Sequence, residues 1–483
     1  MSFVNTILDS LGNSLVITAV GGGPHVIPFL TVYAVWPASF VFLVLYSFAT
    51  QRFSRSTLFN IVICTFMLWF ALFGVLYPLH ETVHFHGLAE TVLLRLPAGM
   101  AGAVGMVRNW MFTTFYVAAE LWGDVVLSLL FWGLANEMTT IKEAPLLYPL
   151  FGIGANVGQT LSGKLLSVFS SSAAPSLSYA RQLQAIMLVV LAFVPLAPAP
   201  SANGAAPVQG ERMSAPAADA ALAPAQKRKA KLTLREALVF LTNSPQIRCL
   251  AVMALAQGLS SNLIEITWKS YLHKLHPSPA AYSAFMGDVA MWTGIVTGTL
   301  MFASPMLFAR WKWRGVAGAT PAFMLWTGLP FFAGCILYAL AHPGGGAGTL
   351  ALRVLVLAGA LLQVFAKGAK FSMFKPAEEM VYIGLDEESR TKGKAAIDVA
   401  GAQTGKSIGS VLQQVLLVAS SGSLTRSLPI LAIAYFGILR AWSRSVVALA
   451  KLHVCSFEAH GAAPSDGLDC GEARLRDTAT HAA

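Results

Sequence analysis

The stretch PSANGAAPVQGERMSAPAADAALAPAQKRKAK, residues 200–231, decides how this chain is organised, because it separates two sets of long apolar segments. Its Ala, Pro, Gly and Ser residues cannot build a hydrophobic core, so we expect a flexible linker over residues 200–245. The linker contains a basic cluster of Lys227, Arg228, Lys229 and Lys231. Such a cluster either binds lipid headgroups or a partner, or acts as a solvated topology signal, and we favour the topology signal.

The composition around this linker is that of a membrane protein. The 483 residues are 55% hydrophobic and 12% charged, and the mean hydropathy is +0.62. A soluble domain averages about 25% charged residues, which is roughly twice the share found here. These values exclude a disordered protein, a secreted disulfide scaffold and an ordinary cytosolic enzyme.

The basic excess and the cysteines indicate neither nucleic acid nor metal as a partner. Lys and Arg number 33 against 23 Asp and Glu, a net charge of +10. Most of these cations lie between apolar runs rather than along one stripe, which argues against nucleic-acid binding. The five cysteines are scattered without a CxxC pair, so the sequence predicts neither a zinc site nor a redox pair.

About twelve segments reach the roughly 20 mostly apolar residues that a transmembrane helix needs. They are residues 3–20, 25–49, 57–77, 104–136, 146–169, 181–199, 248–272, 281–308, 318–341, 350–374, 395–420 and 427–450. The first is the least secure, because it carries Asp9, Gly12 and Asn13. The fourth is too long for one straight crossing, since about 33 residues extend about 50 Å. We expect it to tilt, to break at Gly123, or to extend into water.

Lys and Arg gather in alternate connections, which predicts the sidedness of the chain. One side holds Arg52, Arg55, Lys142, the basic linker, Arg310, Lys312, Arg314, Arg390 and Lys392. Connections on the other side, such as GGGPH (21–25) and HETVHFHG (80–87), are nearly bare of Lys and Arg. Because cytoplasmic loops carry the basic excess, both termini are expected on the basic side, which agrees with an even number of spans.

A repeat links the two sets of segments. GANVGQTLSG (154–163) aligns with GAQTGKSIGS (401–410), each in the fifth span of its set. Two six-helix halves around a long linker are the layout of a major-facilitator-type transporter, with the substrate site between the halves. The prediction is an all-α membrane protein with a first half at 1–199, a linker at 200–245, a second half at 246–452 and a polar tail at 453–483. Two unrelated small-residue packing motifs are the alternative explanation of the repeat.

Several charged residues fall well inside the predicted spans, where an ion is costly and marks a pathway. The candidate substrate-binding residues are Glu120, Glu265, Lys269, Lys367 and Lys406. Ion pairs between helices, or side chains that reach for the interface, are the structural alternative. We favour that alternative for Lys164, Lys370 and Arg108, which we therefore do not expect in the site. So many central cations suit a multiply anionic substrate.

Three other patterns do not predict chemistry. GAQTGKS resembles a phosphate loop, but Ala400 stands where GxxxxGK[ST] requires Gly, and no strand precedes it. His80, His84 and His86 are expected to form a solvated loop rather than a metal site. No nucleophile–base pair is visible, so we expect no enzyme activity, no cofactor and no metal.

Three long blocks resemble one family, the ATP/ADP translocases of plastids and obligate intracellular bacteria. They are AELWGDVVLSLLFWGLANEMTTIKEAPLLYPLFGIGANVG (119–158), NLIEITWKSYL (262–272) and EEMVYIGLDEESRTKGKAAIDVAGAQTGKSIGSVLQQ (378–414). The resemblance implies a carrier that exchanges ATP for ADP, or imports nucleotides, by alternating access in a lipid bilayer. It also implies that the family's required residues correspond to Glu120, Glu265 and Lys406, with Lys392 and Lys394 close by.

The first span departs from the family pattern. The family reads TILRDTKD, whereas this chain reads TILDSLGN (6–13), so an essential lysine falls on Gly12 and an arginine on Asp9. Each lost phosphate contact is worth about 1.5–3 kcal/mol. Three explanations stay open: an altered substrate, compensation by Lys375 and its neighbours, or a transport-inactive structural subunit of a larger membrane complex.

Residues 1–8 show no pattern of a transit or signal peptide. The resemblance favours the plastid inner envelope, with the bacterial inner membrane or another organelle membrane as alternatives.

Overall fold

The computed structural model of the chain describes residues 1–132, 134–135, 144–171, 178–194, 244–342, 350–383 and 402–459. The regular secondary structure in these ranges is helical. The first half contains α1 (Ser2–Thr18), α2 (Val26–Leu30), η1 (Thr31–Val35), α3 (Trp36–Arg52), α4 (Arg55–Leu76), η2 (Tyr77–Leu79), α5 (His80–Val83), α6 (His86–Leu93), η3 (Ala98–Met100), α7 (Ala101–Arg108), α8 (Trp110–Leu121), η4 (Trp122–Phe131), α10 (Ala144–Ser171) and α11 (Tyr179–Phe193). The second half contains α13 (Pro245–Leu275), α14 (Pro279–Ala341), α15 (Leu350–Ala369), η5 (Lys370–Phe374), α16 (Lys375–Ile383), α18 (Ala402–Ala419) and α19 (Leu424–Ala459).

These helices confirm an all-α polytopic membrane protein. Within the described ranges, seven helices are long and apolar enough to cross a membrane. One of them, α14, holds two of the predicted spans, and α1, α10, α11 and α18 coincide with four more. The boundaries at 199, 245 and 452 stay a proposal, because most of the linker and of the polar tail lies outside the described residues.

The long fourth span is interrupted, but the predicted position at Gly123 is wrong. The chain leaves the helix at Asn109, between α7 and α8, where φ is −100° and ψ is 48°. The Asn109 amide donates hydrogen bonds to the carbonyls of Val20 and Gly105, at 3.1 and 3.2 Å, and so ties this turn to the connection that follows α1. Gly123 instead continues the helix inside the π-helical segment η4.

Serine caps and a backbone break set the limits of the longest helices. Ser244 and Ser278 each accept a hydrogen bond from a backbone N–H of the first turn of α13 and α14, and a proline follows each serine. Such a residue pair satisfies one free donor and fixes φ at the helix start. Within α14, Lys312 has φ 51° and ψ −179°, so two spans meet there at the predicted basic connection.

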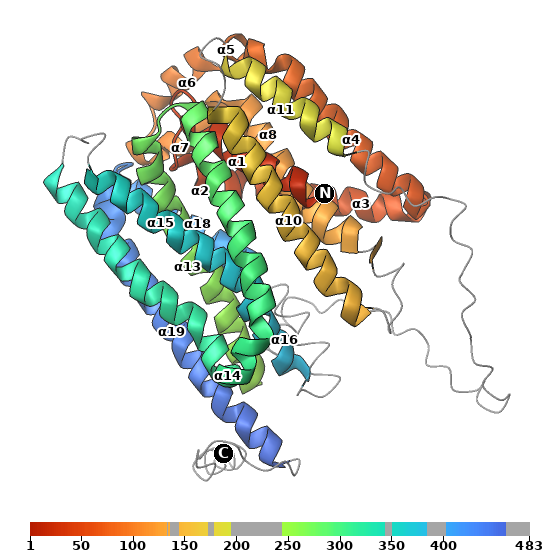
Figure 1. Ribbon diagram of the computed structural model, residues 1–483. Helices are drawn as coiled ribbons and strands as arrows, with labels where there is room; N and C mark the ends of the chain where they lie inside the picture. The colour runs from red at the N-terminus through yellow and green to blue at the C-terminus, as the bar shows by residue number, and fades with distance from the viewer. Residues whose placement is uncertain are drawn as a thin grey trace.

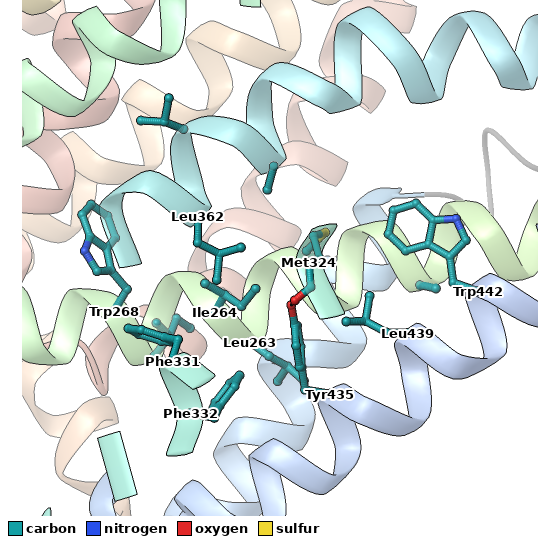
Figure 2. Close-up of a cluster of buried hydrophobic side chains, with 14 of the residues drawn as sticks. Leu263, Ile264, Trp268, Met324, Phe331, Phe332, Leu362, Tyr435, Leu439 and Trp442 are labelled. Carbon is teal, nitrogen blue, oxygen red and sulfur yellow. The ribbon is translucent and has the colours of Figure 1, made fainter. Parts of the chain in front are cut away.

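Each half has its own apolar core, which is why the halves can act as units. In the second half, Tyr435, Phe332 and Trp442 are fully buried where α14 and α19 pack on α13 (Figure 2). The Tyr435 hydroxyl donates to the Met324 carbonyl at 2.7 Å, so this buried polar group is satisfied. A separate cluster of buried residues, mainly from α1, α4, α8, η4 and α11, forms the core of the first half.

Glycines bring α10 of the first half against α14 of the second. The two helices lie side by side between the halves (Figure 1). A Cβ atom added at Gly287 would come within 2.6 Å of the Ser167 nitrogen, and one at Gly294 within 2.7 Å of the Asn156 carbonyl. Small residues permit this approach of two backbones. The predicted repeat segment 154–163 therefore supplies contact between the halves.

The halves also meet at the end of the molecule that is poor in Lys and Arg. Ser283 donates to the Ser14 hydroxyl at 2.8 Å, and Ser14 donates to the Pro279 carbonyl at 3.1 Å. On the opposite flank, the Gln414 amide donates to the Pro28 carbonyl at 2.7 Å. Close contacts on both flanks close this end between the halves.

Candidate functional site

A cavity of about 340 Å³ lies between the halves. It runs from Asn13 and Lys269, next to the closed end, toward Asn5 and Asp124 on the side of the basic connections. The first half lines it with α1, α2, η1, α8 and η4, and the second half with α13, α15, η5 and α18. Its charged lining residues are Asp9, Glu120, Asp124, Glu265, Lys269, Lys367, Lys370 and Lys406.

All five candidate residues from the sequence lie on the wall of this one cavity. They come from α8, α13, α15 and α18, helices that are far apart in the chain. Glu120 and Lys406 line the cavity from opposite halves, as the depth of their spans predicts. The fold thus brings the five side chains to one place, where a single ligand could contact several of them.

The first half gives the cavity an acidic wall, which we define as Asp9, Glu120 and Asp124. Among the described residues that line the cavity, this half contributes no Lys or Arg. Asp9 accepts a hydrogen bond of 3.0 Å from the Asn13 amide one turn along α1. Glu120 and Asp124 are also one turn apart, at the junction of α8 and η4.

The second half gives the cavity a basic wall, which we define as Lys367, Lys370 and Lys406. None of the three forms an ion pair with a carboxylate in the described part of the chain. The Lys370 ammonium lies 5.4 Å from the ring centroid of Phe371, which also lines the cavity. These cations therefore line the cavity without a direct ion pair in the described part of the chain, and they share the cavity with the carboxylates of Asp9, Glu120, Asp124 and Glu265.

Lys269 is different, because its charge is already neutralised. Its side chain is only 3% exposed, and its ammonium lies 2.7 Å from a Glu265 carboxylate oxygen. It also donates to the Asn13 side-chain oxygen of α1 at 2.7 Å. A buried ammonium needs such partners. The resulting Asn13–Lys269–Glu265 cluster joins the two halves at the closed end of the cavity.

Sequence reasoning missed some wall residues and rejected one. Lys370 lines the cavity, so the expectation that its side chain reaches for the interface and stays out of the site is wrong. A second missed group shares the face of α13 with Glu265 and Lys269, at intervals of three to four residues, and consists of Gln257, Ser261 and Asn262. Polar residues that recur every three to four positions along an apolar helix predict a polar face, so this group could have been found from the sequence. Asp9 and Asn13 also line the cavity, although the sequence presents them only as polar residues in an insecure first span.

Other cations that the sequence raised lie away from the cavity lining. The Lys375 ammonium pairs with Glu378 at 2.7 Å, so it does not take the place of the lost first-span lysine on the wall. Arg108 pairs with Glu90 at 3.2 Å near the closed end. Lys164 is exposed on α10 and does not line the cavity.

The histidine-rich connection lines a second cavity of about 400 Å³ at the closed end. His84 lies against Phe112, with ring centroids 4.7 Å apart, and is 7% exposed. Burial, together with His80 and His86 beside it, lowers the pKa of His84 to about 4. Among the described residues, no group of three or more His, Cys, Asp or Glu side chains is placed to hold a metal ion.

Comparisons with known proteins place this arrangement in a family. Residues 1–453 match the model of the family described as TLC ATP/ADP transporter. The chain is 40% identical over 461 residues to ADP,ATP carrier protein 2, chloroplastic, of Arabidopsis thaliana, covering 91% of this chain and 71% of that protein. It is 38% identical over 470 residues to ADP,ATP carrier protein 1 of Chlamydia muridarum, covering 95% of this chain and 87% of that protein.

The fold also resembles that of a solved transporter. The crystal structure of a mutant of the nucleoside transporter NupG superimposes with a TM-score of 0.52 at 12% sequence identity, covering 93% of this chain and 98% of that chain. At this identity the likeness concerns the fold alone, and it agrees with two six-helix halves around a central cavity. The chain belongs to the TLC ATP/ADP transporter family, and it is a multi-pass integral membrane protein of the carrier class.

Proposed function

We propose that this protein carries nucleotides of the ATP/ADP class across a membrane by alternating access, with the central cavity as the binding site. The observation that carries the proposal is the basic wall. An ion at the centre of a membrane helix costs about 2.5–3.5 kcal/mol on insertion scales. Three lysines that form no direct ion pair among the described residues are therefore costly to keep, and a polyphosphate is the ligand that would use them all.

The two walls suggest how a nucleotide lies in the cavity. Its phosphates would bind Lys367, Lys370 and Lys406, because ammonium–phosphate hydrogen bonds are charge-assisted. The acidic wall repels phosphates but accepts hydrogen bonds from ribose hydroxyls and from an exocyclic amine. Tyr116 and Phe371, which also line the cavity, offer aromatic faces to a base.

Transport requires the closed end to open. The contacts that must break there join Asn13 to Lys269, Ser14 to Ser283 and Gln414 to Pro28. All are single hydrogen bonds, each worth about 0.5–3 kcal/mol net depending on charge. A gate of this strength is compatible with rocking of the halves around a fixed site.

Uptake into proteoliposomes tests the proposal. Purified protein is reconstituted with and without internal ADP, and uptake of labelled ATP is measured against a panel of unlabelled nucleotides. We expect uptake that is competed by di- and triphosphates and not by the nucleoside alone. Absence of uptake of ATP, ADP, other nucleoside triphosphates and NAD by folded protein would overturn it.

The proposal also covers whether the protein is a carrier or an enzyme, and in which membrane it lies. We infer that the chain carries its substrate unchanged rather than acting as an enzyme, since the family is one of carriers. The comparisons lend no support to the alternative of a structural subunit in a larger membrane complex. The plastid inner envelope is the proposed location, supported by the 40% identity to the chloroplastic carrier. Immunolocalisation in the source cells checks the location.

A further inference from the structure

A groove of about 460 Å³ lies on the outer surface of the second half, away from the central cavity. It is formed where the last helix, α19, lies beside the second span of α14. Its walls combine apolar side chains, one hydroxyl and three cations. The lining residues are Leu325, Arg440, Ser443, Arg444, Val447, Ala448 and Lys451.

The three cations share one exposed face of α19. Arg440 and Arg444 are one turn apart, and Lys451 returns to the same face because eleven residues are close to three turns. The opposite face of α19 is buried against α13 and α14 through Tyr435, Leu439, Trp442 and Val446, so the cations point out of the protein.

These cations have no carboxylate partner among the described residues. Arg440 lies over the ring of Phe436, with 5.9 Å from its guanidinium carbon to the ring centroid. Neither Arg444 nor Lys451 takes part in an ion pair in the described part of the chain. An arginine in a protein cannot be deprotonated, so both guanidinium charges persist and call for an anion.

The groove lies within the membrane rather than beyond it. Arg314, at the basic connection inside α14, marks the interface on the linker side. From Arg314 to Leu325 the helix advances about 16 Å at 1.5 Å per residue, and the whole hydrocarbon core is about 30 Å thick. The groove therefore extends from the membrane interface into the acyl-chain layer, where free aqueous anions are scarce.

We propose that this groove binds one anionic phospholipid of the leaflet on the linker side. The phosphodiester is held by Arg440 and Arg444, whose side chains reach toward the interface, and an acyl chain continues past Leu325 into the deeper part of the groove. Lys451, nearer the end of the helix, donates a hydrogen bond to an oxygen of the headgroup. A zwitterionic lipid brings its own ammonium group, which competes with these cations, so the groove selects anionic headgroups.

The ordinary alternative is that these residues only set topology and reach toward water. That explanation requires no groove and predicts no headgroup selectivity. Arg426 provides an internal control, because it is an exposed cation on the same helix at the opposite end and lies outside the groove.

Native mass spectrometry of the purified full-length chain in neutral detergent tests the proposal without using transport. Phosphatidylglycerol, phosphatidylcholine and inorganic phosphate are added separately to the wild type, to the triple variant R440Q/R444Q/K451Q and to R426Q. We expect selective retention of one phosphatidylglycerol by the wild type and by R426Q, and retention about tenfold weaker in the triple variant.

Three results would overturn the lipid site. They are equal retention by the triple variant and the wild type, equal retention of phosphatidylcholine and phosphatidylglycerol, and displacement of the lipid by millimolar inorganic phosphate. Thermal unfolding of each variant without added lipid verifies folding. If the triple variant does not fold, R444Q alone, at the centre of the groove, must lower retention relative to R426Q.

Discussion

The two walls of the central cavity come from halves of similar architecture but carry opposite charge. The acidic wall holds Asp9, Glu120 and Asp124, whereas the basic wall holds Lys367, Lys370 and Lys406. The repeat offset between the glycines that begin the two aligned segments carries Glu120 onto Lys367, so a glutamate and a lysine occupy equivalent places. The two halves thus present opposite charge to one cavity.

This difference implies a division of labour. A polyphosphate gains most of its binding energy from one half, because the other half repels it. A carboxylate that faces a bound anion favours release or movement rather than affinity. We therefore expect changes on the basic wall to act on affinity and changes on the acidic wall to act on turnover.

The largest expected effect is that of Lys406→Gln. It removes a cation that faces the cavity without an ion-pair partner in the described chain, and one charge-assisted phosphate contact is worth about 1.5–3 kcal/mol. We expect KM for ATP uptake to rise by about ten- to a hundredfold while expression is retained. Lys406→Arg keeps the charge and should keep most of the affinity; an unchanged KM in Lys406→Gln would contradict the assignment.

Glu120→Gln is expected to lower the maximal rate of uptake without raising KM, in contrast to Lys406→Gln. The amide keeps the size of the side chain and removes a negative charge that faces the basic wall. Binding of ATP should be unchanged or tighter, and the maximal rate should fall by about tenfold, which corresponds to about 1.4 kcal/mol of repulsion that no longer favours release. Initial rates over a range of ATP concentrations separate the two effects. A raised KM with an unchanged maximal rate would refute the division between the walls.

Several features of the fold and site could be predicted from sequence because their signals are local. Apolar length predicts the helices, and the cost of an ion in a membrane singles out Glu120 and Lys406. The break at Asn109 could not be predicted, because it depends on a hydrogen bond to Val20, a residue far away in the sequence. For the same reason the hydrogen bond from the Lys269 ammonium to Asn13 of the other half is visible only in three dimensions.

The lysines of the tenth span show the same limit. Lys367, Lys370 and Lys375 are close in sequence, and of the three only Lys367 is a candidate site residue from the sequence. In the structure Lys367 and Lys370 line the cavity, whereas Lys375 forms an ion pair with Glu378. Which lysine of such a cluster faces the cavity depends on the rotation of the helix about its axis and on the neighbouring side chains. Neither can be deduced from the amino-acid sequence of the span alone.

Asn13→Ala sharpens the comparison at the point where the two halves touch. The change removes the hydrogen bond from the buried Lys269 ammonium and leaves Glu265 as its partner. A hydrogen bond to a charged group contributes about 1.5–3 kcal/mol, so the contact between the halves at the closed end should weaken by about this amount. Hydrogen exchange of the α1 amides should become faster, while exchange in α19 stays as in the wild type. Equal exchange in α1 would show that the contact does not hold the halves together.

The smallest expected effect is that of Lys164→Gln. Lys164 is a lysine on α10, directly after the repeat segment 154–163 of the first half, and it is exposed outside the cavity lining. A solvated or interfacial lysine of this kind contributes little, because water and headgroups already compensate its charge. We expect KM and the maximal rate to change by less than about twofold, within the range of roughly 0.5 kcal/mol that surface substitutions show. Lys164→Gln and Lys406→Gln remove the same charge from α10 and α18, the fifth span of each half, so the ratio of their effects measures position alone. If the two variants lose uptake equally, the loss reflects the overall charge of the membrane domain, and the contrast between an acidic and a basic wall does not govern transport.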